Sequence, residues 1–162
     1  MVCTLAFGQC IAGQMEMSGA CKSDAVNVVD EEVVQLPICS SSDVVAARQK
    51  GRELALKMGF AGSEVTLIAA AISEIARNIV DYAERGEMTF QKIEQDDKPG
   101  ILIVAEDHGP GIQNLAEALQ YGCATRRGIG VGLPGAKWLM DEFEITSRPG
   151  KGTKVTMRKW LV

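Results

Sequence analysis

The sequence predicts an α+β fold in which a layer of helices packs on a mixed, mostly antiparallel β-sheet. The expected elements run in the order strand, two helices, two strands, helix, two strands. Short turns join the neighbouring strands, and the helical segments carry apolar residues every three or four positions. A doubly wound parallel sheet would instead alternate strands and helices along the whole chain. We therefore expect two layers around one core.

The first strand and the first helix follow a segment without clear periodicity. Residues 1–30 mix Met, Cys, Gly and Ser and are predicted to form a poorly ordered extension or a peripheral hairpin, which leaves 31–162 as the domain. A strand is expected in EEVVQLPI, closed by Pro37, and Ser41 or Ser42 then caps a helix that ends at Gly59. The apolar face of this helix is predicted to consist of Val44, Val45, Ala47, Leu54 and Met58.

The second helix has the strongest periodicity in the chain and is predicted from Ser63, as its cap, to Tyr82. The residues of its buried stripe are Ile68, Ile72, Ile75, Ile79 and Tyr82.

Two hairpins make up most of the second half. The strands EMTFQKIEQ and GILIVAED are joined by the turn DDKPG, and FEITSRP and TKVTMRKWLV are joined by GKG. Between the hairpins we expect a short helical piece over 113–119, a glycine-rich loop, and a helix opened by Pro134 that runs through GAKWLMDEF.

Composition limits the classes of protein to which the chain can belong. Its 162 residues, 46% of them hydrophobic, suffice for one cored domain, and a net charge of −4 argues against nucleic acid as a partner. The five cysteines are scattered and never spaced C-x-x-C, which indicates neither a disulfide framework nor a zinc site. The same cysteine pattern favours a reduced, cytoplasmic setting. With no run of roughly 20 apolar residues to span a membrane, we expect no membrane partner.

The stretch RRGIGVGLPGAKW, from Arg126 to Trp138, raises the question of which phosphate its glycines hold. A dinucleotide fingerprint needs a buried strand that runs into its first glycine, whereas the preceding LQYGCATRR is polar. No P-loop pattern occurs either. What remains is a lid whose backbone N–H groups turn toward a triphosphate, helped by the positive end of the following helix. The alternative is a glycine-rich helix entry without a ligand.

Two polar elements favour the phosphate interpretation. In SEIARNIVDYA, Glu74 and Asn78 lie one turn apart beside the isoleucine stripe, and oxygen donors of this kind suit Mg²⁺; a solvated pair is the alternative. In AEDHGPGI, an apolar strand ends in Asp107. This carboxylate can serve as an ordinary turn residue, or it can accept a hydrogen bond from an amine such as that of adenine, with the glycines leaving space for the base.

Taken together and in order, these motifs resemble the GHKL (Bergerat) ATP-binding fold of histidine kinases, gyrase-type ATPases and anti-sigma-factor kinases. The resemblance identifies Glu74-x-x-x-Asn78 as the N box, Asp107-x-Gly109-x-Gly111 as the first glycine box and Gly128-x-Gly130-x-Gly132 as the second. It implies ATP and Mg²⁺ as cofactors, with Glu74 as the general base and Asn78 as the metal ligand. The resemblance further implies that Asp107 binds adenine and that Thr153 supports Asp107 directly or through water. For Arg126 and Arg127 a charge clamp and a plain solvated pair remain open. The residues that the resemblance assigns to the nucleotide are Asn78, Asp107, Gly109, Gly111, Arg126, Arg127, Gly128, Ile129, Gly130, Val131, Gly132, Leu133, Gly152 and Thr153.

Within this fold, the chain resembles the switch serine/threonine kinases of bacterial stressosomes, on the segments DVVAARQKGRELALKMGF, AISEIARNIVDYA, AEDHGPGI and GVGLPGAKWLMDEFEITS. That resemblance implies transfer of the ATP γ-phosphate to STAS-domain partners of the RsbS and RsbR type, followed by activation of an RsbU-like phosphatase. His108, the one histidine, is interpreted as a variable residue of the first glycine box. The alternative is an RsbW-like anti-sigma factor that binds a sigma factor and phosphorylates a STAS antagonist.

Overall fold

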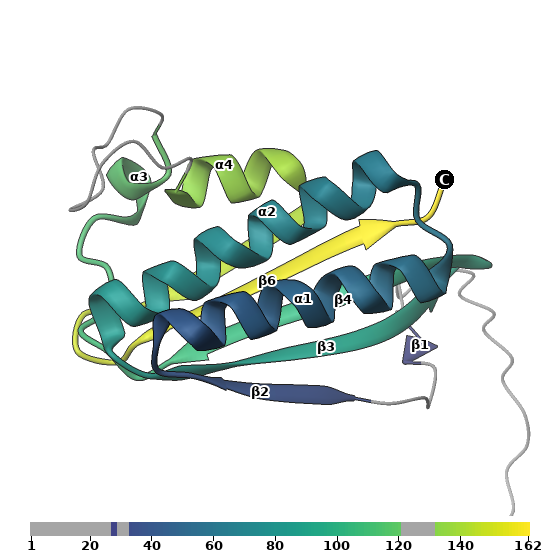
Figure 1. The fold of residues 1–162 in the computed structure, drawn as a ribbon. Coiled ribbons are helices and arrows are strands. Elements are labelled where there is room, and N and C mark those ends of the chain that lie inside the picture. Colours follow the sequence, from purple (N-terminus) through teal and green to yellow (C-terminus); the bar gives the residue numbers. More distant parts are fainter. Residues whose placement is uncertain (1–26, 29–32, 121–131) are drawn as a thin grey trace, which may run out of the picture.

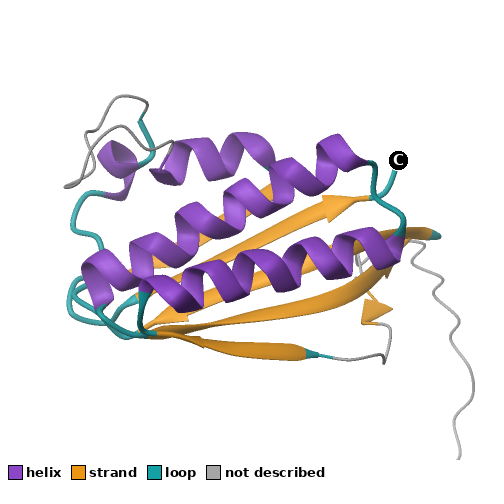
Figure 2. Cartoon of the chain, in the orientation of Figure 1, coloured by secondary structure: helices purple, strands orange, loops and turns teal. Residues whose placement is uncertain are grey.

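The computed structural model describes residues 27–28, 33–120 and 132–162. Within these residues the chain forms a six-stranded sheet with its helices gathered on one face (Figures 1 and 2). This two-layer arrangement confirms the predicted α+β architecture. Every pairing between described strands is antiparallel, so the parallel part implied by a mixed sheet is not found among them.

The strand order of the sheet is β1-β3-β4-β6-β5, and β2 pairs with the same edge of β3 as β1 does. The strands are β1 (Asn27–Val28), β2 (Val34–Ile38), β3 (Gly86–Gln95), β4 (Lys98–Asp107), β5 (Glu142–Ser147) and β6 (Thr153–Trp160). The short strand β1 falls inside the predicted extension 1–30, so the sheet begins earlier than the sequence indicates.

The turn between β3 and β4 and the end of β2 lie at other residues in the structure than the sequence predicts. The hairpin of β3 and β4 turns on Asp96 and Asp97 alone, both with positive φ (50° and 61°), as two-residue hairpin loops require. Lys98 and Pro99 therefore belong to β4 and not to the turn. Pro37 does not close β2, which continues to Ile38, because an edge strand tolerates a residue without a backbone N–H.

The helical layer is formed by four helices and one π-helical turn among the described residues. They are α1 (Ser41–Met58), α2 (Gly62–Asn78), the π-helical turn η1 (Ile79–Ala83), α3 (Leu115–Ala118) and α4 (Gly132–Leu139). The central helix α2 lies between α1 and α4 and contacts both (Figure 1). The predicted helix in GAKWLMDEF is therefore too long, because Phe143 belongs to β5 and pairs with Met157 of β6.

The N-terminus of α1 is organised one or two residues before the predicted cap. Ser40 is the N-cap, and its hydroxyl donates to Oδ2 of Asp43 at 2.7 Å. The backbone N–H of Cys39 donates to the same carboxylate oxygen at 3.0 Å. The hydrogen bond from Ser40, followed by that from Cys39, lowers the pKa of Asp43.

The buried side of α1 is built from small residues, Ala47, Gly51 and Ala55. A Cβ at Gly51 would lie 2.1 Å from Cδ1 of Ile72, so the missing side chain allows α1 to approach α2 closely. Val45 is 65% exposed, and its predicted place on the buried face is wrong.

The isoleucine stripe of α2 is confirmed, since Ile68, Ile72, Ile75 and Ile79 are all buried. Tyr82, the last predicted member, is 44% exposed. The wider π-helical turn after Asn78 shifts the following residues around the helix axis, which explains why the periodicity fails there. The predicted start also changes: Ala61 is the N-cap in place of Ser63, and its N–H donates to Glu64 at 3.1 Å.

The core lies between the helices and the inner face of the sheet. Its largest fully buried side chains on that face of the strands are Phe90, Ile38, Met88, Ile101, Ile103 and Met157. Among the described residues, no helix is both long and apolar enough to span a membrane.

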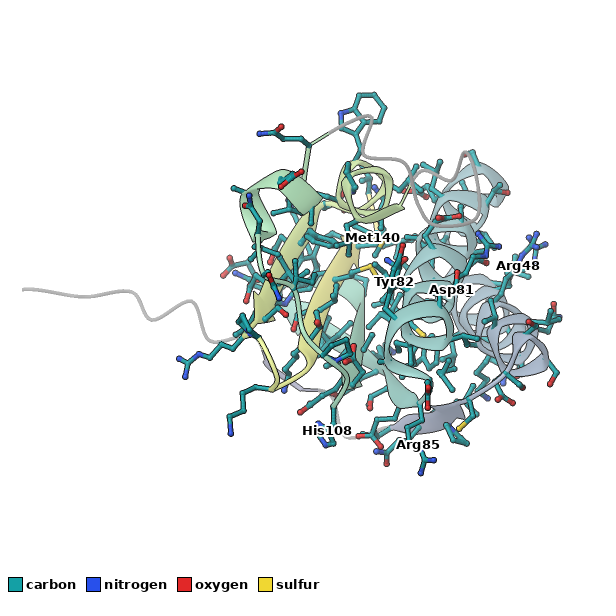
Figure 3. The ribbon with its side chains drawn as sticks, turned by 90° about the vertical axis from the view of Figure 1, so that its left-hand side faces the viewer. Arg48, Asp81, Tyr82, Arg85, His108 and Met140 are labelled. Atoms are coloured by element: carbon teal, nitrogen blue, oxygen red, sulfur yellow. The ribbon has the colours of Figure 1, made fainter. Side chains whose placement is uncertain are left out.

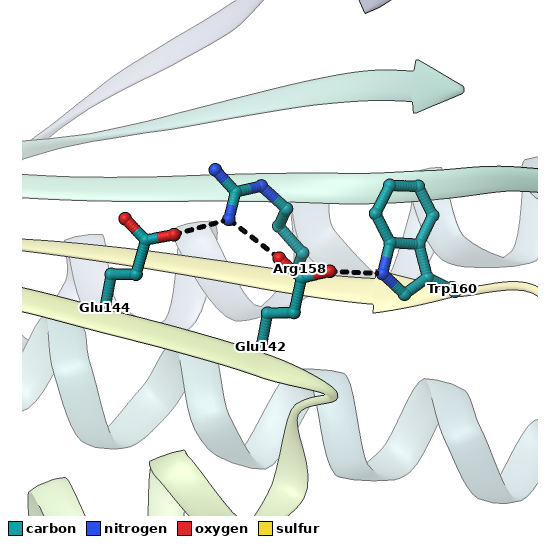
Figure 4. A network of polar contacts seen from close by, with 4 residues as sticks. All are labelled: Glu142, Glu144, Arg158 and Trp160. Atoms are coloured by element: carbon teal, nitrogen blue, oxygen red, sulfur yellow. Dashed lines mark hydrogen bonds and ion pairs between the residues drawn. The ribbon is translucent and has the colours of Figure 1, made fainter. Parts of the chain in front are cut away.

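On the outer face of the sheet, a polar network joins β5 to β6 (Figure 4). Arg158 Nη1 donates to Glu144 at 2.8 Å and to Glu142 at 2.9 Å, and the indole N–H of Trp160 donates to Glu142 at 2.8 Å. The hydrogen bond with Glu144 is the main cause of a raised pKa at Arg158. This network fixes the pairing of the two strands whose turn side contributes to the site described next.

Candidate functional site

The predicted site residues from α2, β4 and β6 lie at the same end of the fold. A Cβ placed on Gly86 would lie 2.8 Å from Cγ2 of Ile79 and 3.1 Å from Cβ of Asp107. Since Ile79 directly follows Asn78, the C-terminal end of α2 lies beside the end of β4. Figure 3 views the molecule from this end and shows Asp81 and Tyr82 of η1 and His108 of the loop after β4.

The side chain of Glu74 is held between two elements. One carboxylate oxygen, Oε2, accepts the backbone N–H of Gly132 at 3.1 Å, and the other, Oε1, accepts Arg77 Nη1 at 2.9 Å. The side chain is 13% exposed. Gly132 is the first residue of α4, so the carboxylate of the N box directly contacts the start of the helix that follows the glycine-rich loop.

Asn78 occupies the last position of α2, immediately before η1. Its side chain is half-buried and has no hydrogen-bond partner within the described residues. π-Helical turns are frequent at functional sites, where they re-aim neighbouring side chains. The described residues hold no cluster of three or more His, Cys, Asp or Glu. One unpartnered amide oxygen fits Mg²⁺, which takes few protein ligands and is held largely by phosphate oxygens and water.

Asp107 is oriented by backbone groups from two sides. Its Oδ1 accepts the N–H of Gly109 at 2.9 Å and the N–H of Thr153 at 3.3 Å. Its Oδ2 has no partner in the part of the chain that the structure describes. Thr153 thus supports Asp107 directly, through its backbone and not through its hydroxyl. The result is a fixed carboxylate with one oxygen available to a ligand.

The glycines of the first glycine box allow close contacts between segments of the protein. A Cβ on Gly109 would lie 2.5 Å from Cβ of Ala83, and one on Gly111 would lie 2.1 Å from the carbonyl oxygen of Arg148. Gly111 also has a φ of 68°. The two glycines bring the loop after β4 against η1 and against the turn between β5 and β6. The space at these positions is therefore filled by the protein, whereas the sequence predicts that it admits a base.

Ser147 is a residue that sequence reasoning missed. Its hydroxyl oxygen accepts the N–H of Ile112 at 2.8 Å, and the hydroxyl donates to the carbonyl of Gly152 at 3.0 Å. The Thr153 hydroxyl lies 2.9 Å away and completes the group. The signal was the alternation of Phe143, Ile145 and Ser147 on the inner face of β5, which places a hydroxyl at the strand end beside Asp107.

The backbone at Gly152 lies so close to Asp107 that no side chain fits there. Gly152 has a φ of 82°, and a Cβ there would lie 2.0 Å from the carbonyl oxygen of Asp107. We expect Gly152→Ala to lower the free energy of unfolding by about 3 kcal/mol or more, because left-handed strain and overpacking add together. Denaturant unfolding measures this loss.

The matched control is Gly150→Ala in the same turn. Gly150 also has a positive φ, 72°, but a Cβ there would meet nothing within 4 Å. Its substitution should cost only the strain, about 1–2 kcal/mol. Equal losses in the two variants would contradict the close approach at Asp107.

The second glycine box is only partly described. Gly132 begins α4 with a φ of 54°, and Leu133 packs partly buried against the core. The remaining predicted residues of this segment, Arg126, Arg127, Gly128, Ile129, Gly130 and Val131, lie outside the described residues.

Comparison with known proteins gives consistent results. Residues 40–159 match the family of the histidine kinase-like ATPase domain. The chain is 44% identical to the serine/threonine-protein kinase RsbT of Bacillus subtilis over 124 residues, which are 76% of this chain and 93% of that protein. It is 34% identical to the anti-sigma F factor of Caldanaerobacter subterraneus subsp. tengcongensis, over 60% of this chain and 71% of the relative.

Among solved structures, the RsbU and RsbW domains of Rv1364c from Mycobacterium tuberculosis superpose with a TM-score of 0.56 at 18% identity. The match covers 79% of this chain but only 32% of that one. At this level of identity the likeness supports the fold alone.

Proposed function

This chain belongs to the histidine kinase-like ATPase domain family, and we propose that it acts as the serine/threonine kinase of a partner-switching system in the cytoplasm. The predicted family and kinase activity are confirmed by the 44% identity to RsbT over nearly the whole of that kinase. The observation that carries the site is the contact between the Glu74 carboxylate and the first N–H of α4.

In the proposed reaction, Asp107 and Asn78 hold the nucleotide. The free Oδ2 of Asp107 accepts the exocyclic amine of adenine, while Oδ1 remains fixed by Gly109 and Thr153. Asn78 would hold Mg²⁺ through its amide oxygen, and the ion would supply neutralisation of charge on the phosphates when bound. The N–H of Gly132 lies at the positive N-terminal end of α4, and a phosphate oxygen bound there replaces the Glu74 carboxylate as its acceptor.

Glu74 then accepts the proton of the acceptor hydroxyl. The hydroxyl oxygen of a Ser or Thr forms a bond to the γ-phosphorus as the bond to the leaving ADP oxygen breaks, and the proton passes to the carboxylate. Because the Gly132 N–H now binds Glu74, a phosphate oxygen at the same N–H would release Oε2 for this proton transfer.

The proposed partners are STAS-domain proteins of the RsbS and RsbR type as phosphoacceptors, and an RsbU-like phosphatase after release. The similarity to RsbT supports them. The second candidate, an RsbW-like anti-sigma factor, is supported by the 34% identity to an anti-sigma F factor, which covers less of either chain.

The experiment that tests the proposal offers the chain γ-labelled ATP with a STAS-domain protein, and separately tests capture of sigma factors by the purified chain. We expect label on one Ser or Thr of the STAS protein, mapped by mass spectrometry, and no retained sigma factor. Stable capture of a sigma factor would favour the anti-sigma function, and absence of label on any protein hydroxyl would contradict the kinase assignment.

A further inference from the structure

Arg77 forms an ion pair with Glu74, the candidate general base, and both residues lie on α2. Its Nη1 lies 2.9 Å from Oε1 of Glu74, one turn earlier on α2. Arg77 is 52% exposed, whereas Glu74 is 13% exposed. Within the described ranges the carboxylate of Glu74 is the only partner of this guanidinium.

This ion pair is expected to contribute little to the free energy of unfolding. Pairs spaced i, i+3 or i, i+4 on a helix surface contribute only weakly, since water and salt screen the exposed partner. The pair Lys57–Glu53 on α1 is of this ordinary kind, with both partners well exposed and 2.9 Å apart. The pair of Arg77 differs because its acidic partner is largely buried and contacts the start of α4.

The two partners of Glu74 behave differently once a nucleotide binds. Gly132 N–H is a neutral donor at a helix start, a position that attracts phosphate oxygens. A phosphate bound there would compete with Glu74 for that donor. Arg77 lies on the same helix as Glu74 and makes a charge-assisted hydrogen bond, so it can still orient the carboxylate after the first contact is lost.

We infer that Arg77 is a positioning residue for phosphotransfer, which fixes the Glu74 carboxylate for the acceptor hydroxyl when the nucleotide occupies the N-terminus of α4. The inference rests on the proposed role of Glu74 as base. It requires that loss of Arg77 slows the chemical step and leaves nucleotide binding intact, because Arg77 does not contact the nucleotide in this arrangement.

The test compares Arg77→Gln, Arg77→Lys and the control Lys57→Gln, which removes the ordinary pair on α1. For each variant, kcat and KM for the STAS acceptor, the Kd of Mg-ATP and Tm are measured. We expect Arg77→Gln to lower kcat about 10- to 100-fold with KM, Kd and Tm unchanged, because a misplaced catalytic group costs rate and not affinity. Arg77→Lys should recover part of kcat, and Lys57→Gln should match the unaltered protein.

Other outcomes overturn the inference in distinguishable ways. An unchanged kcat in Arg77→Gln, together with a strong loss in Glu74→Gln, would remove Arg77 as a positioning residue and leave the base in place. A raised KM for the acceptor at constant kcat would make Arg77 a partner contact. Normal transfer by Glu74→Gln would show that the proposed base itself is wrong.

Discussion

Glu74→Gln should bind Mg-ATP normally and transfer phosphate about 10²- to 10⁴-fold more slowly than the unaltered chain. Glutamine has the same shape and can still accept the N–H of Gly132 through its amide oxygen, so the start of α4 keeps its contact. It cannot accept the proton of the acceptor hydroxyl. Single-turnover transfer to the STAS protein measures the chemical step, and calorimetry measures the affinity for nucleotide.

The matched control for this variant is Glu64→Gln on the same helix. Glu64 accepts the N–H of Ala61 at 3.1 Å, at the opposite end of α2 from the site. The Glu64→Gln variant should transfer phosphate at the rate of the unaltered protein. Unaltered transfer by Glu74→Gln would exclude Glu74 as the general base.

Asp107→Asn should weaken ATP binding on the order of 100-fold, because a charge-assisted hydrogen bond is lost and a donor replaces an acceptor. The amide oxygen of asparagine can take the place of Oδ1 and keep the N–H groups of Gly109 and Thr153. The amide nitrogen then occupies the position of Oδ2 and faces the amine of adenine. The Kd of Mg-ATP, measured by calorimetry, reports this change.

Inosine triphosphate provides the internal comparison for Asp107→Asn. Its base carries a carbonyl oxygen where adenine carries the amine, so the variant amide can donate to it. We expect the unaltered chain to prefer ATP and the variant to lose that preference. Asp43→Asn, at the start of α1, serves as the control. An equal loss of affinity for both nucleotides in Asp107→Asn would mean that Asp107 does not recognise the base.

The parts of the fold that the sequence predicts are those governed by local patterns. The stripe of Ile68, Ile72, Ile75 and Ile79 is a repeated signal, and the strands EMTFQKIEQ and GILIVAED joined by a tight turn are a local one. Each agrees with the structure. Tyr82 departs from the stripe because a π-helical turn follows Asn78, and the sequence carries no local signal for that extra residue.

The candidate site also contains residues that the sequence predicts and residues that it does not. Glu74, Asn78 and Asp107 could be named in advance because each lies at a fixed position in a motif, next to a helix stripe or a strand end. Ser147 could not, because its partners Ile112 and Gly152 come from segments joined only in the folded chain. The close contacts of Gly109 and Gly111 are also tertiary, so a motif shows that glycine is present but not what it approaches.

One nucleotide should span Asp107, Asn78 and Glu74, and a crystal structure of the chain with Mg²⁺ and a non-hydrolysable ATP analogue will show whether it does. We expect the adenine amine on Oδ2 of Asp107, the metal about 2.1 Å from the amide oxygen of Asn78, and the γ-phosphate facing Glu74. A nucleotide bound elsewhere, or one whose γ-phosphate points away from Glu74, would contradict the account.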